Sequence, residues 1–182
     1  MTLDQFTDEQ LIVEVRENDK EKYAEIIRRY QLKLSHYLRK FIKNSDELED
    51  VLQEVFIRTY RNLYAFDVNK KFSAWIYRIA HNQAINHIKK NNKGSISLDE
   101  HEWEIVDEKM DLKKEVDVGL AKIRVGKGIA SLKDKYREPL ILYFFEQKSY
   151  DEISDILRVP TSTVGTLIKR GKEALKEFLE NK

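Results

Sequence analysis

The sequence predicts an all-α protein built from two small helical domains, and three observations predict it. The 182-residue chain has only two prolines and six glycines, and its first 93 residues contain no glycine. Apolar residues recur every three or four positions over long stretches, which is the period of a helix that buries one face. No stretch alternates apolar and polar residues as a half-buried strand would.

The first domain is expected over residues 1–92 as a helical bundle. Its first helix should begin at Thr7, because Thr7 and Gln10 have the spacing of a capping box. Three apolar stripes at helical spacing follow, and they run over residues 23–41, 48–63 and 72–88. Each stripe predicts one helix with a face turned to a common core.

The helical pattern stops after residue 92. The turn-rich residues 91–97 are followed by residues 99–117, where nine acidic residues stand against three basic ones. We interpret residues 93–119 as a flexible acidic linker. Gly126 and Gly128 lower the helix propensity further on, so the entry to the second domain is uncertain from sequence.

The second domain is expected over residues 120–182. Pro139 should lie in the first turn of a helix or kink it. Ser149 and Glu152 have capping-box spacing at the start of a short helix, which residues 158–160 should end. A second helix then follows, so the segment has the order of a helix-turn-helix.

Charge is distributed in blocks, although the net charge is only +1. Residues 58–93 hold eight basic residues and one acidic residue, whereas residues 99–117 are mostly acidic. Blocks of one sign suit a polyanion or a charged protein surface, but they also occur as solvated helix faces. Sequence alone leaves both interpretations open.

The second helix of a helix-turn-helix enters the major groove with its N-terminal half. Here that half offers short donors and acceptors for phosphates and base edges, and cations for phosphates follow. The candidate residues are Thr161, Ser162, Thr163, Gly165, Thr166, Lys169, Arg170 and Lys172. The alternative is an ordinary helical hairpin with a hydroxyl cap.

Residues 64–93 mix aromatic, basic and amide side chains, a combination that suits single-stranded nucleic acid. We nevertheless favour plain core roles for Phe72, Trp75 and Ile79. His81 and His87 fit an exposed polar face, and zinc binding is not expected because no third and fourth ligand lie nearby.

Several classes of function are not expected. The chain has no cysteine, which excludes a disulfide scaffold or a thiolate nucleophile. It has no glycine-rich phosphate loop or hydrolase signature, so we expect no enzyme, no catalytic residue and no cofactor. It has no leader-like start and no apolar run of about 20 residues, so we expect a cytoplasmic protein without membrane insertion.

Four segments together resemble the extracytoplasmic-function (ECF) class of bacterial RNA polymerase sigma factors. Residues 46–56 resemble the family's polymerase-docking helix, and residues 72–82 resemble its helix for melting the minus-ten element. Residues 132–138 with 149–153 resemble the opening of the second sigma domain. Residues 159–164 resemble the turn into the helix that recognises the minus-thirty-five element.

The resemblance implies a sigma region 2-like bundle and a region 4-like helix-turn-helix, with binding and melting roles but no covalent chemistry. It implies docking on core RNA polymerase through Asp46, Glu49, Asp50, Gln53, Glu54 and Phe56. It implies contacts with melted minus-ten DNA through Asn69, Lys70, Lys71, Trp75, Arg78, His81, Asn82, Asn86, Lys89 and Lys90. The candidate residues of the second helix would contact the minus-thirty-five duplex, the loop over residues 64–71 would hold a flipped base, and an anti-sigma protein would be a further partner.

The sequence departs from the family pattern at the second helix. Arg158 and Ser162 replace usual glycines, while Gly165 and Leu167 replace usual cations. In the first domain, Asn86 and Lys89 stand where the family usually has Asp and Arg. Two other functions remain alternatives: a free-standing helix-turn-helix regulator, and a helical adaptor that binds only proteins.

Overall fold

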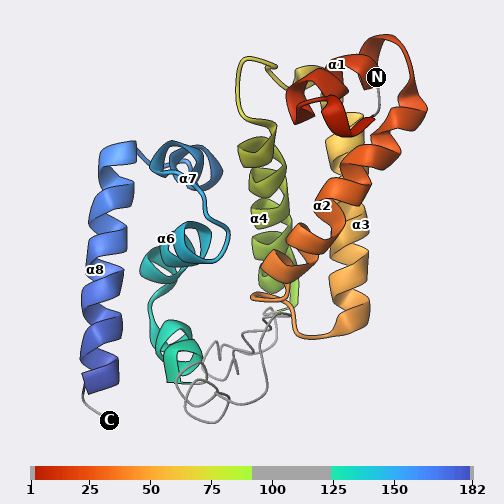
Figure 1. Cartoon of the computed structure of the whole chain (residues 1–182). Coiled ribbons are helices and arrows are strands. Elements are labelled where there is room, and N and C mark those ends of the chain that lie inside the picture. The colour runs from red at the N-terminus through yellow and green to blue at the C-terminus, as the bar shows by residue number, and fades with distance from the viewer. Residues whose placement is uncertain (1–2, 92–123, 181–182) are drawn as a thin grey trace, which may run out of the picture. The chain divides into compact units, whose positions relative to one another are not determined.

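A computed structural model describes residues 3–91 and 124–180, whose helices are joined by turns and loops and which contain no strand within those ranges (Figure 1). The helices divide into two compact units, and residues 3–91 belong to the first. Residues 124–150 and 159–180 belong to the second, whereas residues 151–158 group with the first. The all-α expectation is confirmed, whereas the expected linker over residues 93–119 lies outside the described residues.

The first body consists of four α-helices and three short 3-10 helices. In chain order they are η1 (Leu3–Gln5), α1 (Asp8–Glu17), η2 (Lys20–Lys22), α2 (Tyr23–Leu38), α3 (Ser45–Arg61), η3 (Leu63–Ala65) and α4 (Phe72–Asn91). Helices α2, α3 and α4 pack against one another in pairs (Figure 1).

Side-chain caps fix where two of these helices begin. Thr7 caps α1, and the predicted capping box is confirmed: the backbone N–H of Gln10 donates to the Thr7 hydroxyl, and the backbone N–H of Thr7 donates to the side-chain oxygen of Gln10. The Asn44 side chain caps α3 by accepting from two backbone N–H groups of its first turn.

The core of the first body forms where the three apolar stripes meet. The largest fully buried side chains include Leu34, Tyr37, Phe72, Ile76 and Tyr77. Aromatic rings pack edge to face or tilted within it, with Tyr37 and Tyr77 centroids 5.2 Å apart. Burial of these stripes fixes which faces of α3 and α4 remain exposed.

Helix α1 is fastened to α2 by charged hydrogen bonds. The Arg29 guanidinium of α2 donates to Asp8 of α1 at 2.8 Å, and it is held in place by a 2.7 Å bond to buried Glu25 of its own helix. The Tyr30 hydroxyl also donates to Asp8. Because charged hydrogen bonds are stronger than neutral ones, these contacts give α1 a defined position on the bundle.

The second body holds helical residues 124–131, α6 (Asp134–Phe144) and α8 (Thr161–Glu180). We describe α7 (Tyr150–Leu157) with it, because the Tyr150 ring packs against Tyr143 at 5.4 Å. Gly126 and Gly128 both lie within the helix at 124–131, despite their low propensity. Pro139 lies in the second turn of α6, one turn later than the first of the two expected positions.

The segment from α7 to α8 has helix-turn-helix order, as expected. Arg158 ends α7 with φ of 55°, in the left-handed region that favours glycine. The Pro160 carbonyl then accepts hydrogen bonds from the N–H groups of Thr163 and Val164, which starts α8. Val164 and Ile168 bury one face of α8 and leave the opposite face to solvent.

Candidate nucleic-acid interface

Helix α3 exposes an acidic face opposite its buried one. Asp46, Glu49, Asp50 and Gln53 are all exposed, and their spacing of three, four and seven residues puts them on one side of the helix. Glu54 lies beside this face and pairs with Arg58 at 2.5 Å. Five of the six residues predicted to dock on polymerase therefore gather on one surface.

Phe56, the sixth, lies elsewhere. Only 8% of it is exposed, because it belongs to the apolar stripe predicted over residues 48–63 and joins the core. The same face instead continues into Ile57 and Tyr60, which are 43% and 40% exposed. Sequence reasoning missed both, although they follow Gln53 at four and seven residues and fall outside the predicted stripe.

The loop between α3 and α4 is held by local hydrogen bonds. The Asp67 carboxylate accepts from the backbone N–H and the side-chain amide of Asn69, both at 3.0 Å, and the backbone bond lowers the pKa of Asp67. Lys70 N–H donates to the Asp67 carbonyl and closes a tight turn. Asn69, Lys70 and Lys71 are exposed on this turn, as a DNA-contacting loop requires.

Helix α4 carries four of the remaining minus-ten candidates on one face. Arg78, Asn82, Asn86 and Lys89 recur at three- and four-residue spacing, away from the buried side of the helix. Trp75 lies one turn before Arg78, half-buried, with its ring 5.3 Å from that of Phe66.

The expectation of core roles holds fully for Phe72, whereas Trp75 and Ile79 remain half-exposed. Lys90 is exposed next to Lys89 in the last turn of α4.

His81 does not belong to that face. It is only 9% exposed, and its Nδ1 lies 3.0 Å from the Tyr37 hydroxyl within the core. Burial lowers the pKa of His81 to about 4, so the ring is neutral at pH 7. Neither the expected exposed position nor a DNA contact fits a buried neutral imidazole. His87 is half-buried rather than exposed, with Nε2 2.9 Å from Glu47.

Helix α8 presents the predicted hydroxyl and cationic residues on its outer side. Ser162, Thr166, Lys169 and Arg170 are exposed at helical spacing on one face, and Thr161 is exposed at the helix start. The remaining candidates, Thr163 and Gly165, are half-buried. The structure therefore supplies a surface of donors without a large side chain at Gly165.

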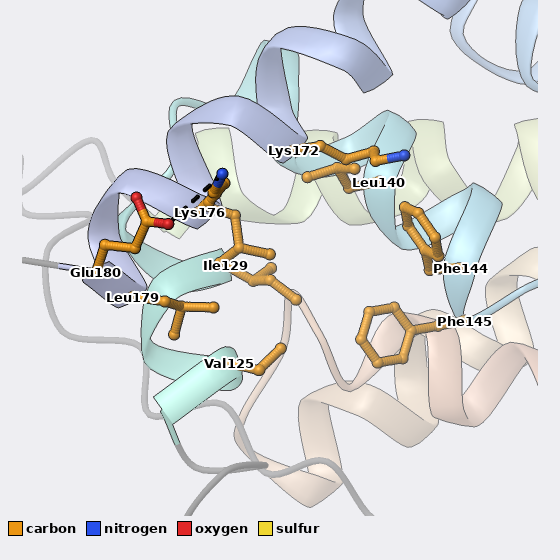
Figure 2. A pocket seen from close by; sticks show the side chains of 10 residues that line it. Val125, Ile129, Leu140, Phe144, Phe145, Lys172, Lys176, Leu179 and Glu180 are labelled. Carbon is orange, nitrogen blue, oxygen red and sulfur yellow. Dashed lines mark ion pairs between the residues drawn. The ribbon is translucent and has the colours of Figure 1, made fainter.

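Lys172 borders a different feature, an apolar groove of about 600 Å³ within the second body (Figure 2). Its ammonium lies 5.9 Å from the centroid of the Phe144 ring, which is half-exposed in this groove. The lining is mainly apolar and consists of Val125, Ile129, Leu140, Phe144, Phe145, Leu175 and Leu179, with Lys172, Lys176 and Glu180. Lys172 thus faces the groove rim instead of extending the face of Ser162 and Thr166.

Within residues 3–91 and 124–180, no three His, Asp or Glu side chains gather in a way that could hold a metal ion. In the same described ranges, no helix has the length and apolar character needed to cross a membrane.

Sequence comparison matches two families in order along the chain. Sigma-70 region 2 matches residues 26–94, and Sigma-70, region 4 matches residues 123–175. The ECF RNA polymerase sigma factor SigW of Bacillus subtilis (strain 168) is 34% identical over 179 residues, which cover 93% of this chain and 95% of SigW. The ECF RNA polymerase sigma-E factor of Escherichia coli (strain K12) is 31% identical and covers 94% of each chain.

Two solved structures share the fold. CnrH, solved in complex with the cytosolic domain of CnrY, has a TM-score of 0.71 at 19% identity and covers 96% of this chain and 97% of its own. The sigma factor RpoE of Bartonella quintana, solved with the anti-sigma factor NepR, has a TM-score of 0.66 at 17% identity and covers 88% and 98%.

Proposed function

Because this chain belongs to the ECF class of RNA polymerase sigma factors, we propose that it binds core RNA polymerase and directs it to specific promoters, where it recognises and helps to melt DNA. The chain contributes binding and positioning, while the polymerase carries out the chemistry. We place this activity in the cytoplasm, where core polymerase acts.

The observation that carries the docking step is the exposed face of α3. Asp46, Glu49, Asp50 and Gln53 remain in solvent while the opposite side of the same helix is buried. A free-standing helix-turn-helix regulator needs no such face on a separate helical body, so this surface favours the polymerase subunit over that alternative. Ile57 and Tyr60 add apolar area to it, and aromatic side chains are enriched at protein interfaces.

Promoter recognition is divided between the two bodies in this proposal. The loop over residues 64–71 and the exposed side of α4 face the melted minus-ten strand, with cations for phosphates and amides for bases. The outer face of α8 enters the major groove at the minus-thirty-five element. Gly165 and Leu167 leave that face with fewer cations than the family pattern, so Lys169 and Arg170 carry most of its phosphate contact.

Run-off transcription tests the proposal. Core polymerase is incubated with a library of promoter fragments, with and without this chain, and the transcripts are sequenced. We expect initiation at a shared pair of upstream elements only when the chain is present. Absence of any chain-dependent start site would refute the proposal, whereas DNA binding without core polymerase would support the free-standing regulator.

A narrower experiment tests the docking face. Asp50→Ala with Gln53→Ala should weaken co-purification with core polymerase, since both side chains lie at its centre. The matched control is Glu17→Ala with Gln31→Ala, which removes one acid and one amide from other exposed positions of the first body. Equal recovery of the two double variants would exclude Asp50 and Gln53 from docking.

Regulation by a second protein belongs to the same proposal. ECF sigma factors are typically held inactive by anti-sigma proteins, and we propose that one such protein binds this chain. Affinity capture from the source cells, followed by transcription with the captured protein added back, tests it. A captured protein that leaves chain-dependent initiation unchanged would contradict the proposal.

A further inference from the structure

Helix α1 contacts both ends of the loop that joins α3 to α4. This helix precedes residues 26–94, over which the Sigma-70 region 2 family matches. Two of its charged side chains, Glu9 and Arg16, reach backbone groups more than 45 residues further along the chain. Neither residue was a site candidate from sequence, because a single long-range contact leaves no periodic pattern.

Arg16 forms hydrogen bonds with the beginning of the loop. Its Nε donates to the Leu63 carbonyl at 3.0 Å, and its Nη2 donates to the carbonyls of Leu63 and Phe66. These carbonyls lie on η3 and directly after it, so one planar guanidinium fork joins two points of the chain. The Tyr64 hydroxyl returns a hydrogen bond of 2.9 Å to the Arg16 carbonyl.

Glu9 holds the other end. Its Oε1 accepts a hydrogen bond of 3.0 Å from Phe72 N–H, the first residue of α4. That N–H has no partner within its own helix, since the first N–H groups of any helix lack one. A carboxylate at this position also complements the helix dipole.

The loop is therefore fixed at entry and exit by the same helix. Between the two fixed points, the Asp67 turn presents Asn69 and Lys70 to solvent. Tyr64 is 71% exposed and lies next to the Arg16 guanidinium, 5.9 Å from its carbon. The exposed loop side chains thus belong to a segment whose two ends are both held by α1.

We propose that Arg16 and Glu9 are positioning residues for minus-ten recognition: α1 clamps the loop so that a flipped base meets a preformed site. This inference rests on the proposed function of the loop. It makes α1 part of promoter specificity, even though the hydrogen bonds of its two residues go to backbone groups of the same chain. Preorganised loops bind more tightly because less ordering remains to be done on binding.

The test uses the full chain with core polymerase and a promoter library that is randomised separately at the minus-ten and minus-thirty-five elements. Transcript sequencing gives the base preference at each position. For Arg16→Gln we expect the preference at the loop-read minus-ten position to fall about tenfold, because the charged hydrogen bonds to the Leu63 and Phe66 carbonyls are lost. Preference at the minus-thirty-five element and co-purification with polymerase should remain.

Four further variants separate the clamp from other roles. Arg16→Lys keeps the charge but lacks the planar fork, so it should lose preference like Arg16→Gln; restoration of the wild-type preference would overturn the clamp. Glu9→Ala should reduce minus-ten preference, whereas Glu9→Gln keeps an oxygen acceptor and should restore it. Arg39→Gln removes the same charge from an exposed site outside the loop and should have no effect.

The possible outcomes distinguish a failure of this inference from a failure of the proposed function on which it rests. If the wild-type chain selects promoters and Arg16→Gln selects them with the same profile, the clamp is wrong while the function stands. If Arg16→Gln lowers the base preference equally at the minus-ten and minus-thirty-five elements, Arg16 has only a general structural role and the inference fails. If the wild-type chain selects nothing, the proposed function and the clamp fail together.

Discussion

Replacing His81 with glutamine should remove a pH dependence from the stability of the first body. The native ring is buried beside Tyr37 and has its pKa lowered to about 4 by that burial, from 6.5. Each unit of difference between the folded and unfolded pKa corresponds to about 1.4 kcal/mol, so full protonation of the unfolded chain costs the folded state roughly 3 kcal/mol.

The sign follows from which state takes up the proton. Below pH 6.5 the unfolded His81 becomes charged, while the folded one stays neutral until about pH 4. The contribution of neutral His81 to the free energy of unfolding is complete above pH 6.5. It is lost progressively as the pH falls towards 4, and about 2 kcal/mol is lost at pH 5. Hydrogen bonds from Arg28 and Arg29 lower the pKa of buried Glu25 to about 2. Protonation of Glu25 therefore adds its own loss of stability only near and below pH 4.5.

Urea unfolding between pH 7.5 and 5 measures this effect. In a Trp103→Phe background the fluorescence of Trp75 reports the first body alone, since the chain has only two tryptophans. Wild-type stability should fall by about 2 kcal/mol over this range, and His81→Gln should remove most of the decline. The control variant His36→Gln leaves the buried ring of His81 in place and should show the same decline as the wild type. Parallel declines in wild type and His81→Gln would refute the reasoning.

Four other substitutions test local features of the two bodies. Arg158→Gly should stabilise the second body by about 1 kcal/mol, measured by hydrogen exchange in α8, because glycine adopts a positive φ without steric strain. Arg158→Ala retains the Cβ atom and therefore the strain, so it should not stabilise the second body. Gly165→Ala and Gly171→Ala gain equal helix propensity, but the added methyl would lie 3.4 Å from Tyr150 in the first and 2.8 Å from Leu140 in the second. The second should therefore be less stable by about 1–3 kcal/mol, and equal exchange rates would contradict this. Thr7→Ala removes the cap of α1 and should lower the urea stability of the first body by about 1 kcal/mol; no change would exclude a contribution from the cap.

Local sequence signals were sufficient to predict much of the fold. The capping box at Thr7 needs only a hydroxyl and an amide three residues apart, and both were visible in the sequence. The stripes of α2, α3 and α4 identified buried faces because a helix repeats its orientation every 3.6 residues. The exposed faces carrying Asp50 and Arg78 followed from the same periodicity.

Residues at the border of a face were only partly predictable in this way. Phe56 belongs to the predicted apolar stripe of α3 and is buried as that stripe predicts, whereas the family resemblance had assigned it to the docking surface. His81 lies at the edge between the buried and exposed sides of α4, where a small rotation decides burial. Periodicity locates the centre of a stripe, but packing against neighbouring helices sets its width. The contacts of Arg16 were beyond sequence reasoning for a different reason, since they depend on where a loop 47 residues away is placed.

Charge serves two purposes in the first body, and this decides which substitutions can test binding. Asp46 lies in the first turn of α3 and Lys89 in the last turn of α4, where each also complements the helix dipole. Removing either charge would cost roughly 0.3–1 kcal/mol of stability as well as any contact with a partner. Asp50 and Arg78 lie further inside their helices, beyond the reach of that effect. Loss of binding on substitution of Asp50 or Arg78 therefore reports the interface itself, whereas the same loss at the helix ends mixes interface and stability.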